Sequence, residues 1–393
     1  MNMQHPRIAV VTGTRAEFGL LTPVLKALRD RHGTTPRIYA TGTHPIAAHG
    51  HTIDEMRAVG FPPDCVVDLL VGGDSRAAMG KSIGLGTISF VERFEADRPD
   101  CVVVLGDRFE LLAVATATLS LGIPLVHIEG GHVTEGAIDD TIRHALTKIA
   151  RLHMTSTETY ARRLRQMGED PATVHVVGAT GLDNIAHAAR MDRAALEQSL
   201  GFSLDGAPLF VVTHHPVTTA QDLSALDEIR AVLDALSRFE TARIVFTQAN
   251  ADPGHADITE AIIAFVAQRP AQRLLVPSLG FVRYLSLVEL ADAVIGNSSS
   301  GVIEVPSLGV PTVNIGPRQH GRLRAPSVID VAPEAGKIAS AIADALLPRM
   351  KAVAARKENP MGDGTAGRRI ADILSTTDFA AMKAKPFFDL PTE

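Results

Sequence analysis

The chain of 393 residues is 46% hydrophobic, with a formal net charge of -6 and a pI near 6.2. That length exceeds the usual size of one hydrophobic core, so we expect two domains of comparable size. The acidic balance argues against nucleic acid and membrane surfaces as partners, because binding to either usually needs basic patches. Cys65 and Cys101 are too few for a thiolate metal site or a disulfide framework. Since the sequence contains neither a signal peptide nor a long apolar span, we expect a cytoplasmic protein.

Apolar runs of strand length alternate with longer helical patterns along the chain, which is typical of parallel α/β architecture. The runs of the first half occupy residues 7–12, 37–42, 66–70, 101–106, 124–130, 152–157 and 174–178. Those of the second half occupy residues 208–215, 243–248, 273–277, 293–297 and 311–316. A polar helical stretch and a turn separate the halves between residues 183 and 207. We therefore predict two Rossmann-like domains facing a cleft, over residues 1–185 and 186–360.

Three acidic residues come after two successive predicted strands. Asp107 directly follows the first of them, and Glu129 and Asp139 follow the apolar part of the second. Ligands of open parallel sheets bind outside the carboxyl ends of the strands, so these acids are expected to converge on one crevice. The alternative is that each acid only caps a helix. Glu129 fits that alternative poorly, because it lies between an apolar strand and a pair of glycines.

The first predicted strand leads into a helix that begins near Arg15. Free backbone N–H groups and the positive end of the helix dipole favour a phosphate at such a position. The turn lacks GxGxxG, so it supports dinucleotide binding only weakly. The alternative for Arg15 is a surface ion pair with Glu17.

A Ser-rich helix start follows the strand at 293–297 and is the best predicted anion site in the chain. Ser298 and Ser299 offer hydroxyls and backbone donors, and Gly301 would let a ligand approach the backbone closely. Glu304, about one turn further on, could accept hydrogen bonds from ribose hydroxyls. The alternative is a helix cap without a ligand. Two such helix starts, with carboxylates between them, predict a nucleotide sugar lying across the cleft.

Two histidines end predicted strands. His215 could reach the cleft as an acid, a base or a phosphate donor, and His44 occupies an equivalent place in the first half. For each of them the alternative is a satisfied structural histidine. The sequence contains no HExxH, CxxC or clustered His/Asp spacing, so it implies neither a metal nor another cofactor.

Six motifs are spread over nearly the whole chain: TGTRAEFGLL, LGDRFE, HIEGGHVTEGAIDDTIRHALTK, HHPVT, GNSSSGVIEVPSLGVPTVNIGPRQ and PFFDL. Together they resemble the hydrolysing UDP-N-acetylglucosamine 2-epimerases of sialic and legionaminic acid synthesis. The resemblance implies the two-domain fold of GT-B glycosyltransferases. It also implies that residues 361–393, with a helix at 364–374, cross back to pack on the first domain. A homodimer or homotetramer is expected from the same resemblance.

The resemblance also implies roles for individual residues. Asp107, Glu129 and Asp139 would be acid/base carboxylates, and His215 a catalytic or phosphate-contacting histidine. The substrate contacts expected from the resemblance and from the motifs above are Arg15, His44, Arg108, Arg143, Asn250, Tyr284, Ser298, Ser299, Gly301, Glu304 and Arg318. Relatives often have an acid directly after the Gly pair, where this chain has His132, so the preferred sugar stays open.

The chemistry explains why several carboxylates are needed. In an α-linked UDP-N-acetylglucosamine the C2 hydrogen and the C1 oxygen are antiparallel, so a base can drive elimination of UDP to a 2-acetamidoglycal. Hydration with a proton from the opposite face then inverts C2.

The alternative functions are a non-hydrolysing epimerase, a GT-B glycosyltransferase and a nucleotide-sugar sensor. The TEGAIDD segment and the RAEF start favour the hydrolysing branch of the epimerases. UDP and GDP both stay open as the nucleotide, as does the sugar.

Overall fold

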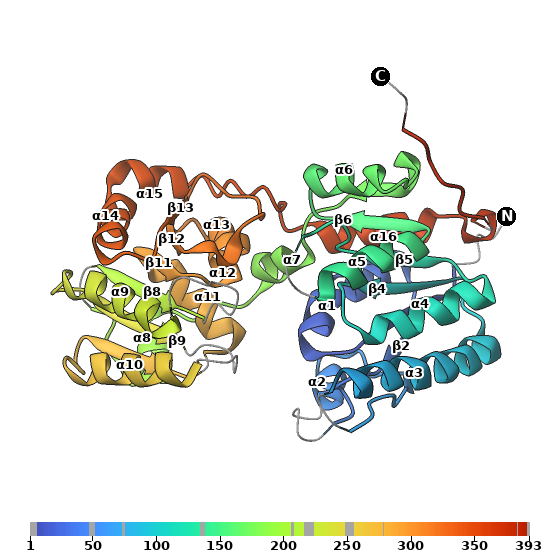
Figure 1. Cartoon of the computed structure of the whole chain (residues 1–393), viewed down its shortest axis with the longest axis horizontal. Coiled ribbons are helices and arrows are strands. Elements are labelled where there is room, and N and C mark those ends of the chain that lie inside the picture. Colours follow the sequence, from blue (N-terminus) through green and yellow to red (C-terminus); the bar gives the residue numbers. More distant parts are fainter. Residues whose placement is uncertain are drawn as a thin grey trace. The chain divides into compact units, whose positions relative to one another are not determined.

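The computed structural model describes residues 6–46, 52–72, 75–133, 138–205, 208–215, 224–247, 255–277, 279–382 and 384–390. The chain divides into two compact units (Figure 1). Unit 1 comprises Met1–Asn184 with Gly362–Glu393, and unit 2 comprises Ile185–Met361. Within the described ranges, the helices are all too short or too polar to cross a membrane.

Unit 1 is built on a seven-stranded parallel sheet of order β3-β2-β1-β4-β5-β6-β7. Its strands are β1 (Ile8–Thr12), β2 (Arg37–Ala40), β3 (Cys65–Val66), β4 (Cys101–Leu105), β5 (Leu125–Ile128), β6 (Leu152–Thr155) and β7 (Val174–Val176). The central strands β1 and β4 are buried along their whole length, as expected for a parallel sheet covered on both faces. The predicted strand at 66–70 is wrong beyond Val66, because β3 is a two-residue edge strand.

Helices cover both faces of this sheet (Figure 1). Alternate residues of β1 point to opposite faces, so Ile8 and Val10 pack with α1 and α16 while Ala9 and Val11 pack with α3 and α4. The helices of unit 1 are α1 (Arg15–His32), α2 (Ile53–Ala58), α3 (Arg76–Asp97), α4 (Glu110–Leu121), α5 (Ile138–Ile149), α6 (Glu158–Gln166) and α16 (Ala366–Thr376), with short 3-10 helices η2 (Pro171–Thr173) and η4 (Phe379–Ala381). Helix α7 (Thr180–His187) begins in unit 1 and ends in unit 2.

The C-terminal helix returns to unit 1, which confirms the expectation from the resemblance. The carboxylate of Asp183 accepts hydrogen bonds from the backbone N–H groups of Ala366 and Gly367 at 2.9 and 2.6 Å, and so caps α16. Gly367 packs directly on α1, because a Cβ built there would lie 2.7 Å from the Pro23 carbonyl carbon. The close helix contact therefore depends on this glycine.

The segment after α16 is tied to the ends of α5 and α6. Lys385 Nζ donates to the carbonyls of Thr147, Lys148 and Ala150, at 2.9, 2.9 and 2.6 Å. Its ammonium group also contacts the buried carboxylate of Glu169 at 2.5 Å. A cation at the C-terminus of a helix stabilises the exposed carbonyls there.

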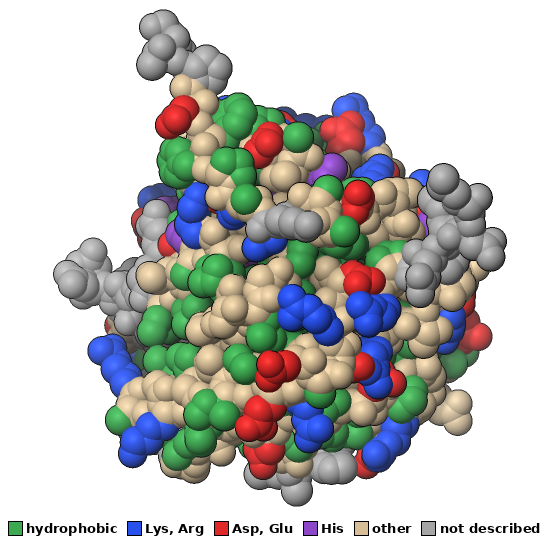
Figure 2. All heavy atoms as spheres, turned by 90° about the vertical axis from the view of Figure 1, so that its right-hand side faces the viewer, with side chains coloured by type: hydrophobic (Ala, Val, Ile, Leu, Met, Phe, Trp, Pro, Cys, Tyr) green, Lys and Arg blue, Asp and Glu red, His purple; other side chains and the backbone are tan. Residues whose placement is uncertain are grey.

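On the face seen in Figure 2, basic and acidic side chains are interspersed with apolar ones.

Unit 2 contains a six-stranded parallel sheet of order β10-β9-β8-β11-β12-β13. Its strands are β8 (Leu209–Thr213), β9 (Arg243–Thr247), β10 (Arg273–Val276), β11 (Ala293–Gly296), β12 (Thr312–Ile315) and β13 (Val328–Val331). The expected strands are present, but β13 was not predicted. It is a short edge strand whose residues are all at least partly exposed, so it lacks a clear apolar run.

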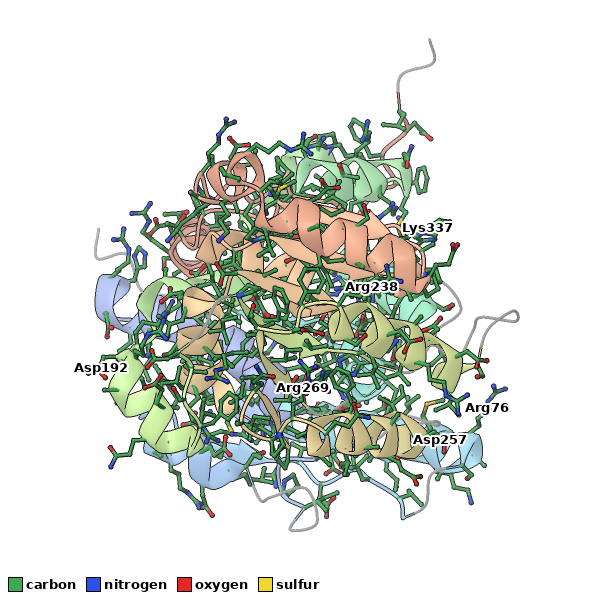
Figure 3. The ribbon with its side chains drawn as sticks, turned by 90° about the vertical axis from the view of Figure 1, so that its left-hand side faces the viewer. Arg76, Asp192, Arg238, Asp257, Arg269 and Lys337 are labelled. Carbon is green, nitrogen blue, oxygen red and sulfur yellow. The ribbon has the colours of Figure 1, made fainter. Side chains whose placement is uncertain are left out.

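Helices of unit 2 bury a second core of aliphatic and aromatic side chains against this sheet. They are α8 (Arg193–Leu200), α9 (Ala225–Ser237), α10 (His255–Ala267), α11 (Gly280–Leu290), α12 (Ser299–Ile303), α13 (Val305–Leu308), α14 (Ala335–Leu346) and α15 (Pro348–Ala354), with the 3-10 helix η3 (Pro317–Gln319). Two of the charged residues labelled in Figure 3 stabilise helices of this unit: Asp192 caps α8, and Lys337 of α14 pairs with Glu334.

Candidate functional site

The carboxyl edge of the unit 1 sheet brings Asp107 and Glu129 out at neighbouring positions. Asp107 follows Gly106 after β4, and Glu129 directly follows β5. These strands pair in parallel with Leu105 opposite Ile128, so both acids leave the sheet at the same edge. The predicted convergence of the two strand ends is therefore observed, while the chemical roles of the acids stay predictions.

Glu129 has an uncommon backbone conformation. Its φ is 66°, and among the described residues only one other non-glycine residue, Lys357, has a positive φ. Its N–H donates to the carbonyl of Met154 at 2.8 Å. Gly131 follows with φ 87°, and a Cβ built on it would lie 2.6 Å from the Tyr160 carbonyl oxygen. Backbone strain on the order of 1 kcal/mol or more is held here by tight packing, and such strain clusters at functional sites.

Arg143 holds the carboxylate of Asp107. The guanidinium is buried; its Nη2 contacts Asp107, and its Nη1 donates to the His132 carbonyl at 2.8 Å and to Asp140 Oδ1 at 3.0 Å. These contacts fix the guanidinium beside the Asp107 carboxylate, and the expected contact of Arg143 with the substrate stays a prediction. Asp140 was not predicted, although an acid three residues before an arginine on a helix is a recognisable pairing signal.

Asp139 lies in the first turn of α5, and its charge reaches Arg108. Burial alone would lower the pKa of Arg108, but the carboxylates of Glu110, Glu17 and Asp139 raise it above its ordinary value. Arg108 Nε donates to Glu110 Oε1 at 2.7 Å. Arg108 and Asp139 are thus within electrostatic range of each other at this edge.

His132 occupies the position where an acid was expected from the resemblance. Its Nε2 lies 3.0 Å from Ser156 Oγ, and its ring stacks on Tyr160 with centroids 4.1 Å apart. The imidazole is therefore packed against an aromatic ring and bonded to a hydroxyl, an environment that suits a ring better than a carboxylate.

Arg15 and His44 have protein partners in the structure. The Arg15 side chain is 73% exposed and pairs with Glu55 at 2.8 Å, so its alternative pairing with Glu17 is wrong, while its expected phosphate contact stays a prediction. Glu17 instead closes a capping box with Thr14. His44 is fully buried; its ring nitrogens lie 3.1 and 2.7 Å from the hydroxyls of Thr12 and Thr52. Burial lowers the pKa of His44 to about 4, which favours the structural alternative for this neutral ring.

In unit 2 an asparagine joins the ends of two neighbouring strands. Asn297 Oδ1 accepts from the His215 N–H at 2.7 Å, and Asn297 Nδ2 donates to the His215 carbonyl at 2.8 Å. Because Gly296 pairs with Thr213 across β11 and β8, His215 and Ser298 leave the sheet at the same edge. Arg318 Nη1 also donates to the Asn297 carbonyl, at 3.1 Å. Three predicted residues of the anion site are therefore gathered there.

The predicted Ser-rich helix start is present, and the helix that it begins is short. Ser298 is the N-cap of α12, which spans only Ser299–Ile303, and its side chain makes no capping hydrogen bond. Gly301 has a packing role that we did not predict. A Cβ built on it would lie 2.9 Å from Thr312 Cγ2 on β12, so the glycine allows close contact between helix and strand, while the expected close approach of a ligand stays a prediction.

Tyr284, Ser300 and Glu304 form one cluster beside α12. The Tyr284 hydroxyl lies 2.7 Å from Ser300 Oγ. Burial and the charge of Glu304 raise the pKa of Tyr284 above its ordinary value. Burial likewise raises the pKa of Glu304, although the hydrogen bond with Ser300 and the charge of Arg322 lower it.

Asn250, which we expected at the substrate, lies outside the described residues. In the described part of the chain, His, Cys, Asp and Glu side chains form no group of three or more that could hold a metal ion.

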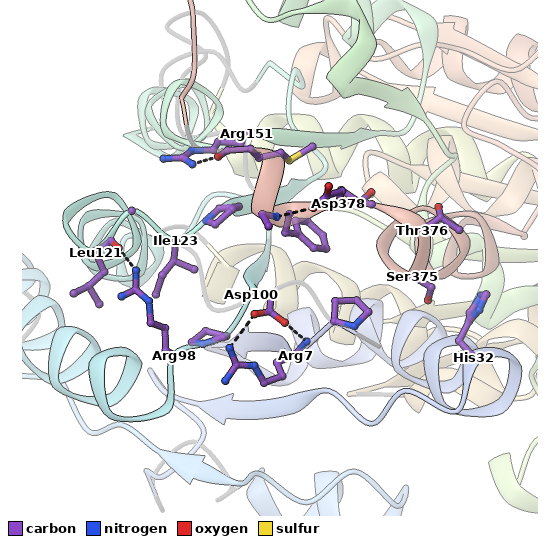
Figure 4. A pocket seen from close by; sticks show the side chains of 18 residues that line it. Arg7, His32, Arg98, Asp100, Leu121, Ile123, Arg151, Ser375, Thr376 and Asp378 are labelled. Atoms are coloured by element: carbon purple, nitrogen blue, oxygen red, sulfur yellow. Dashed lines mark hydrogen bonds and ion pairs between the residues drawn. The ribbon is translucent and has the colours of Figure 1, made fainter. Parts of the chain in front are cut away.

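The hollow shown in Figure 4 lies at the opposite edge of the unit 1 sheet. It has a volume of about 1090 Å³ and is lined by residues that precede β1, β4, β5 and β6. Its cationic groups have protein partners: Arg7 Nη2 pairs with Asp100 at 3.0 Å, and Arg98 donates to the Leu121 carbonyl at 3.0 Å. Because ligands of parallel sheets bind at the carboxyl ends, this hollow is not the candidate site.

Comparison with known proteins indicates the family of the chain. The chain matches the family described as UDP-N-acetylglucosamine 2-epimerase over residues 26–375. It is 37% identical to the GDP/UDP-N,N'-diacetylbacillosamine 2-epimerase (hydrolyzing) of Campylobacter jejuni, over 84% of this chain and 85% of that protein. It is 36% identical to polysialic acid biosynthesis protein P7 of Escherichia coli, over 98% of each. The crystal structure of UDP-GlcNAc 2-epimerase from Neisseria meningitidis bound to UDP-GlcNAc aligns with a TM-score of 0.76 and 20% identity, covering 94% and 99% of the two chains.

The two parallel α/β sheets, with a C-terminal helix that returns to unit 1, have the GT-B-like fold of nucleotide-sugar 2-epimerases. The length of the family match and the identity of the relatives narrow this class further. The chain belongs to the UDP-N-acetylglucosamine 2-epimerase family, and it is an enzyme.

Proposed function

We propose that the protein is a hydrolysing 2-epimerase, which converts a UDP-N-acetylglucosamine-type nucleotide sugar into a free N-acetylmannosamine-type sugar and UDP. The observation that carries the proposal is the pair of acids, Asp107 and Glu129, at adjacent strand ends, with Asp139 and Arg108 at the same edge. The similarity to a relative whose name includes "hydrolyzing" supports the release of the nucleotide.

The proposed reaction has two steps. First, a carboxylate removes the C2 proton while the C1–O bond breaks, so that UDP leaves and a C1=C2 double bond forms. Second, an acid returns a proton to C2 from the opposite face while water adds its oxygen to C1 and gives one of its protons to a carboxylate, which leaves a hydroxyl at C1. The C2 hydrogen is only weakly acidic, because no carbonyl is next to it. Stabilising the leaving group must therefore share the work with positioning of the base.

We assign proton transfer to Asp107, Glu129 and Asp139, with Arg143 fixing the Asp107 carboxylate. The nucleotide is assigned to unit 2. Ser298, Ser299, Arg318 and His215 would hold the diphosphate, Glu304 the ribose, and Tyr284 the base. An anion would have to replace Glu55 as the partner of Arg15 before Arg15 could contribute.

The substrate is a UDP- or GDP-linked 2-acetamido sugar, either N-acetylglucosamine or a 4-acetamido-4,6-dideoxy relative. Incubation with UDP-N-acetylglucosamine, UDP-diacetylbacillosamine and its GDP counterpart, followed by mass analysis, tests this. We expect free nucleoside diphosphate and a free epimerised sugar from at least one of them. An epimer still attached to its nucleotide would show a non-hydrolysing enzyme, and release of UDP only with an added acceptor would show a glycosyltransferase.

Replacing Ser298 and Ser299 together by Ala should weaken UDP binding. Each lost hydrogen bond to the charged diphosphate is expected to cost about 1.5 to 3 kcal/mol. Isothermal titration calorimetry with UDP measures the loss, and circular dichroism checks the fold. The control is Ser224→Ala, because Ser224 is the N-cap residue of another helix of unit 2, α9. Equal UDP affinity in wild type and double variant would remove α12 from the nucleotide site.

A further inference from the structure

Two buried carboxylates lie beneath the carboxyl edge of unit 1, and the proposed chemistry does not use them. Glu17, in the first turn of α1, accepts through Oε2 from the backbone N–H groups of Gly13 and Thr14, at 2.8 and 3.0 Å. Glu110, the first residue of α4, is fully buried and accepts through Oε1 from Arg108 Nε at 2.7 Å. Each carboxylate is thus fixed by short, directed contacts.

The backbone of Gly13 touches both carboxylates. It donates a hydrogen bond to Glu17, and a Cβ built on it would lie 2.6 Å from Glu110 Oε1. Gly42, with φ 60°, approaches from the other side, and its Cβ would lie 2.8 Å from the same oxygen. The Glu110 carboxylate therefore fits between two chain segments that must lack side chains. The TGTRAEF motif predicts a helix start. Only the structure shows that Glu110, which is far from this motif in the sequence, lies beside Gly13.

The charges around the pair do not balance if both acids are ionised. Arg108 is the cation that contacts Glu110, and the Arg108 charge also interacts with the negative charge of Asp139. Glu17 Oε1 and Glu110 Oε2 are buried without a hydrogen-bond partner among the described residues. Burying a second, uncompensated charge costs several kcal/mol, so such pairs usually keep a proton. Burial, followed by the negative charge of Glu110, raises the pKa of Glu17 to about 7. The hydrogen bonds from Gly13 and Thr14 and the positive charge of Arg108 lower this pKa, but by less.

We propose that Glu17 and Glu110 hold one proton between them, and that Glu110 is a positioning residue for Arg108. With Nε bound to Glu110, the Nη1 and Nη2 groups of Arg108 have no hydrogen-bond partner among the described residues. The Arg108 side chain is 38% exposed, so these nitrogens are accessible to an anionic group of the substrate. This second role rests on the proposed function; the shared proton does not.

The shared proton is tested by unfolding, which needs no substrate. Glu17→Gln mimics the protonated acid and keeps the capping box, where Gln is as suitable as Glu. The wild-type acid keeps its proton up to about pH 7 when folded, but only to its ordinary value when unfolded. The contribution of protonated Glu17 to the free energy of unfolding is therefore complete below about pH 4.5 and is lost as the pH rises through about 7. Relative to wild type, Glu17→Gln should gain melting temperature between pH 5 and pH 8.

Glu55→Gln is the matched control, because Glu55 is an exposed carboxylate paired with Arg15. Its melting temperature should differ from that of wild type by the same amount at both pH values. A constant difference for Glu17→Gln across this range would overturn the shared proton.

The positioning role is tested by kinetics on the substrate identified above. Glu110→Ala should lower kcat/KM by roughly tenfold or more, and Glu110→Gln, which retains an oxygen to accept from Nε, should restore most of it. If Glu110 acts through Arg108, adding Glu110→Ala to Arg108→Ala should lower the rate no further. Effects that multiply in folded variants would overturn the positioning role. Absence of any turnover would count against the proposed function, while the unfolding test would still decide the shared proton.

Discussion

Replacing Glu129 by Gln or Asp139 by Asn should lower turnover by roughly 100-fold or more and leave the melting temperature nearly unchanged. The amides keep the size and much of the hydrogen bonding of the acids but cannot transfer a proton. Asp107→Asn should lower turnover similarly and also cost stability, because the buried Arg143 loses the negative charge of one of its partners. At least one of the three variants should release the 2-acetamidoglycal, since a group needed mainly for hydration leaves elimination partly intact.

Asp192→Asn is the matched control for these three variants. Asp192 accepts from the Ala195 N–H at 2.8 Å and is an ordinary helix cap, for which Asn is equally good. It should show wild-type turnover. If the three acids are also only caps, their amide variants should behave like Asp192→Asn, with near-normal turnover and stability changes of about 1 kcal/mol or less. That result would remove them from the catalytic assignment while leaving the family membership intact.

Glu169→Gln should lower the free energy of unfolding by about 3 to 5 kcal/mol, the usual cost of removing one partner from a buried ionic network. The Glu169 side chain is only 1% exposed and contacts Lys148 at 2.7 Å, His153 at 2.9 Å and Lys385 at 2.5 Å. Burial by itself would raise the pKa of Glu169, but the hydrogen bonds from these three side chains lower it to about 2. Urea unfolding at pH 7 measures the loss.

The same network predicts how stability changes in acid. Because the pKa of Glu169 is lower in the folded chain than in the unfolded one, its contribution is complete above about pH 4.5 and is lost as the pH falls towards 2. The control is Glu158→Gln, which removes an ion pair with Arg165 from a carboxylate that is 67% exposed, and it should change stability by less than about 1 kcal/mol. Equal losses of stability in the two variants would show that the ionic network around Glu169 contributes no more to stability than an exposed ion pair does.

The sequence predicted what depends on strand pattern and missed what depends on contacts between distant segments. The apolar runs at 101–106 and 124–130 are long and flanked by turn residues, so the neighbouring exits of Asp107 and Glu129 followed from the rule for parallel sheets. No pattern, by contrast, indicated that Arg15 would pair with Glu55 or that Lys385 would cap α5. Those contacts join residues that are far apart in the chain.

The buried positions were the hardest to assign. His44 ends a strand in the same way as His215, and only the fold shows that two threonine hydroxyls enclose it. Gly301 follows three serines, which suggested a ligand beside its backbone but gave no sign that it also packs against Thr312 on β12. A residue's place at a strand end therefore indicated the edge of the sheet correctly, but not whether its side chain was enclosed by the protein.

The most direct test of the central claim is to run the reaction in deuterated water. Elimination removes the C2 hydrogen, and hydration returns a hydrogen to the opposite face from an acid in exchange with solvent. We expect equimolar free nucleoside diphosphate and a free manno-configured sugar with deuterium at C2, measured by NMR and mass spectrometry. A released sugar that keeps its original C2 hydrogen throughout would contradict the elimination mechanism.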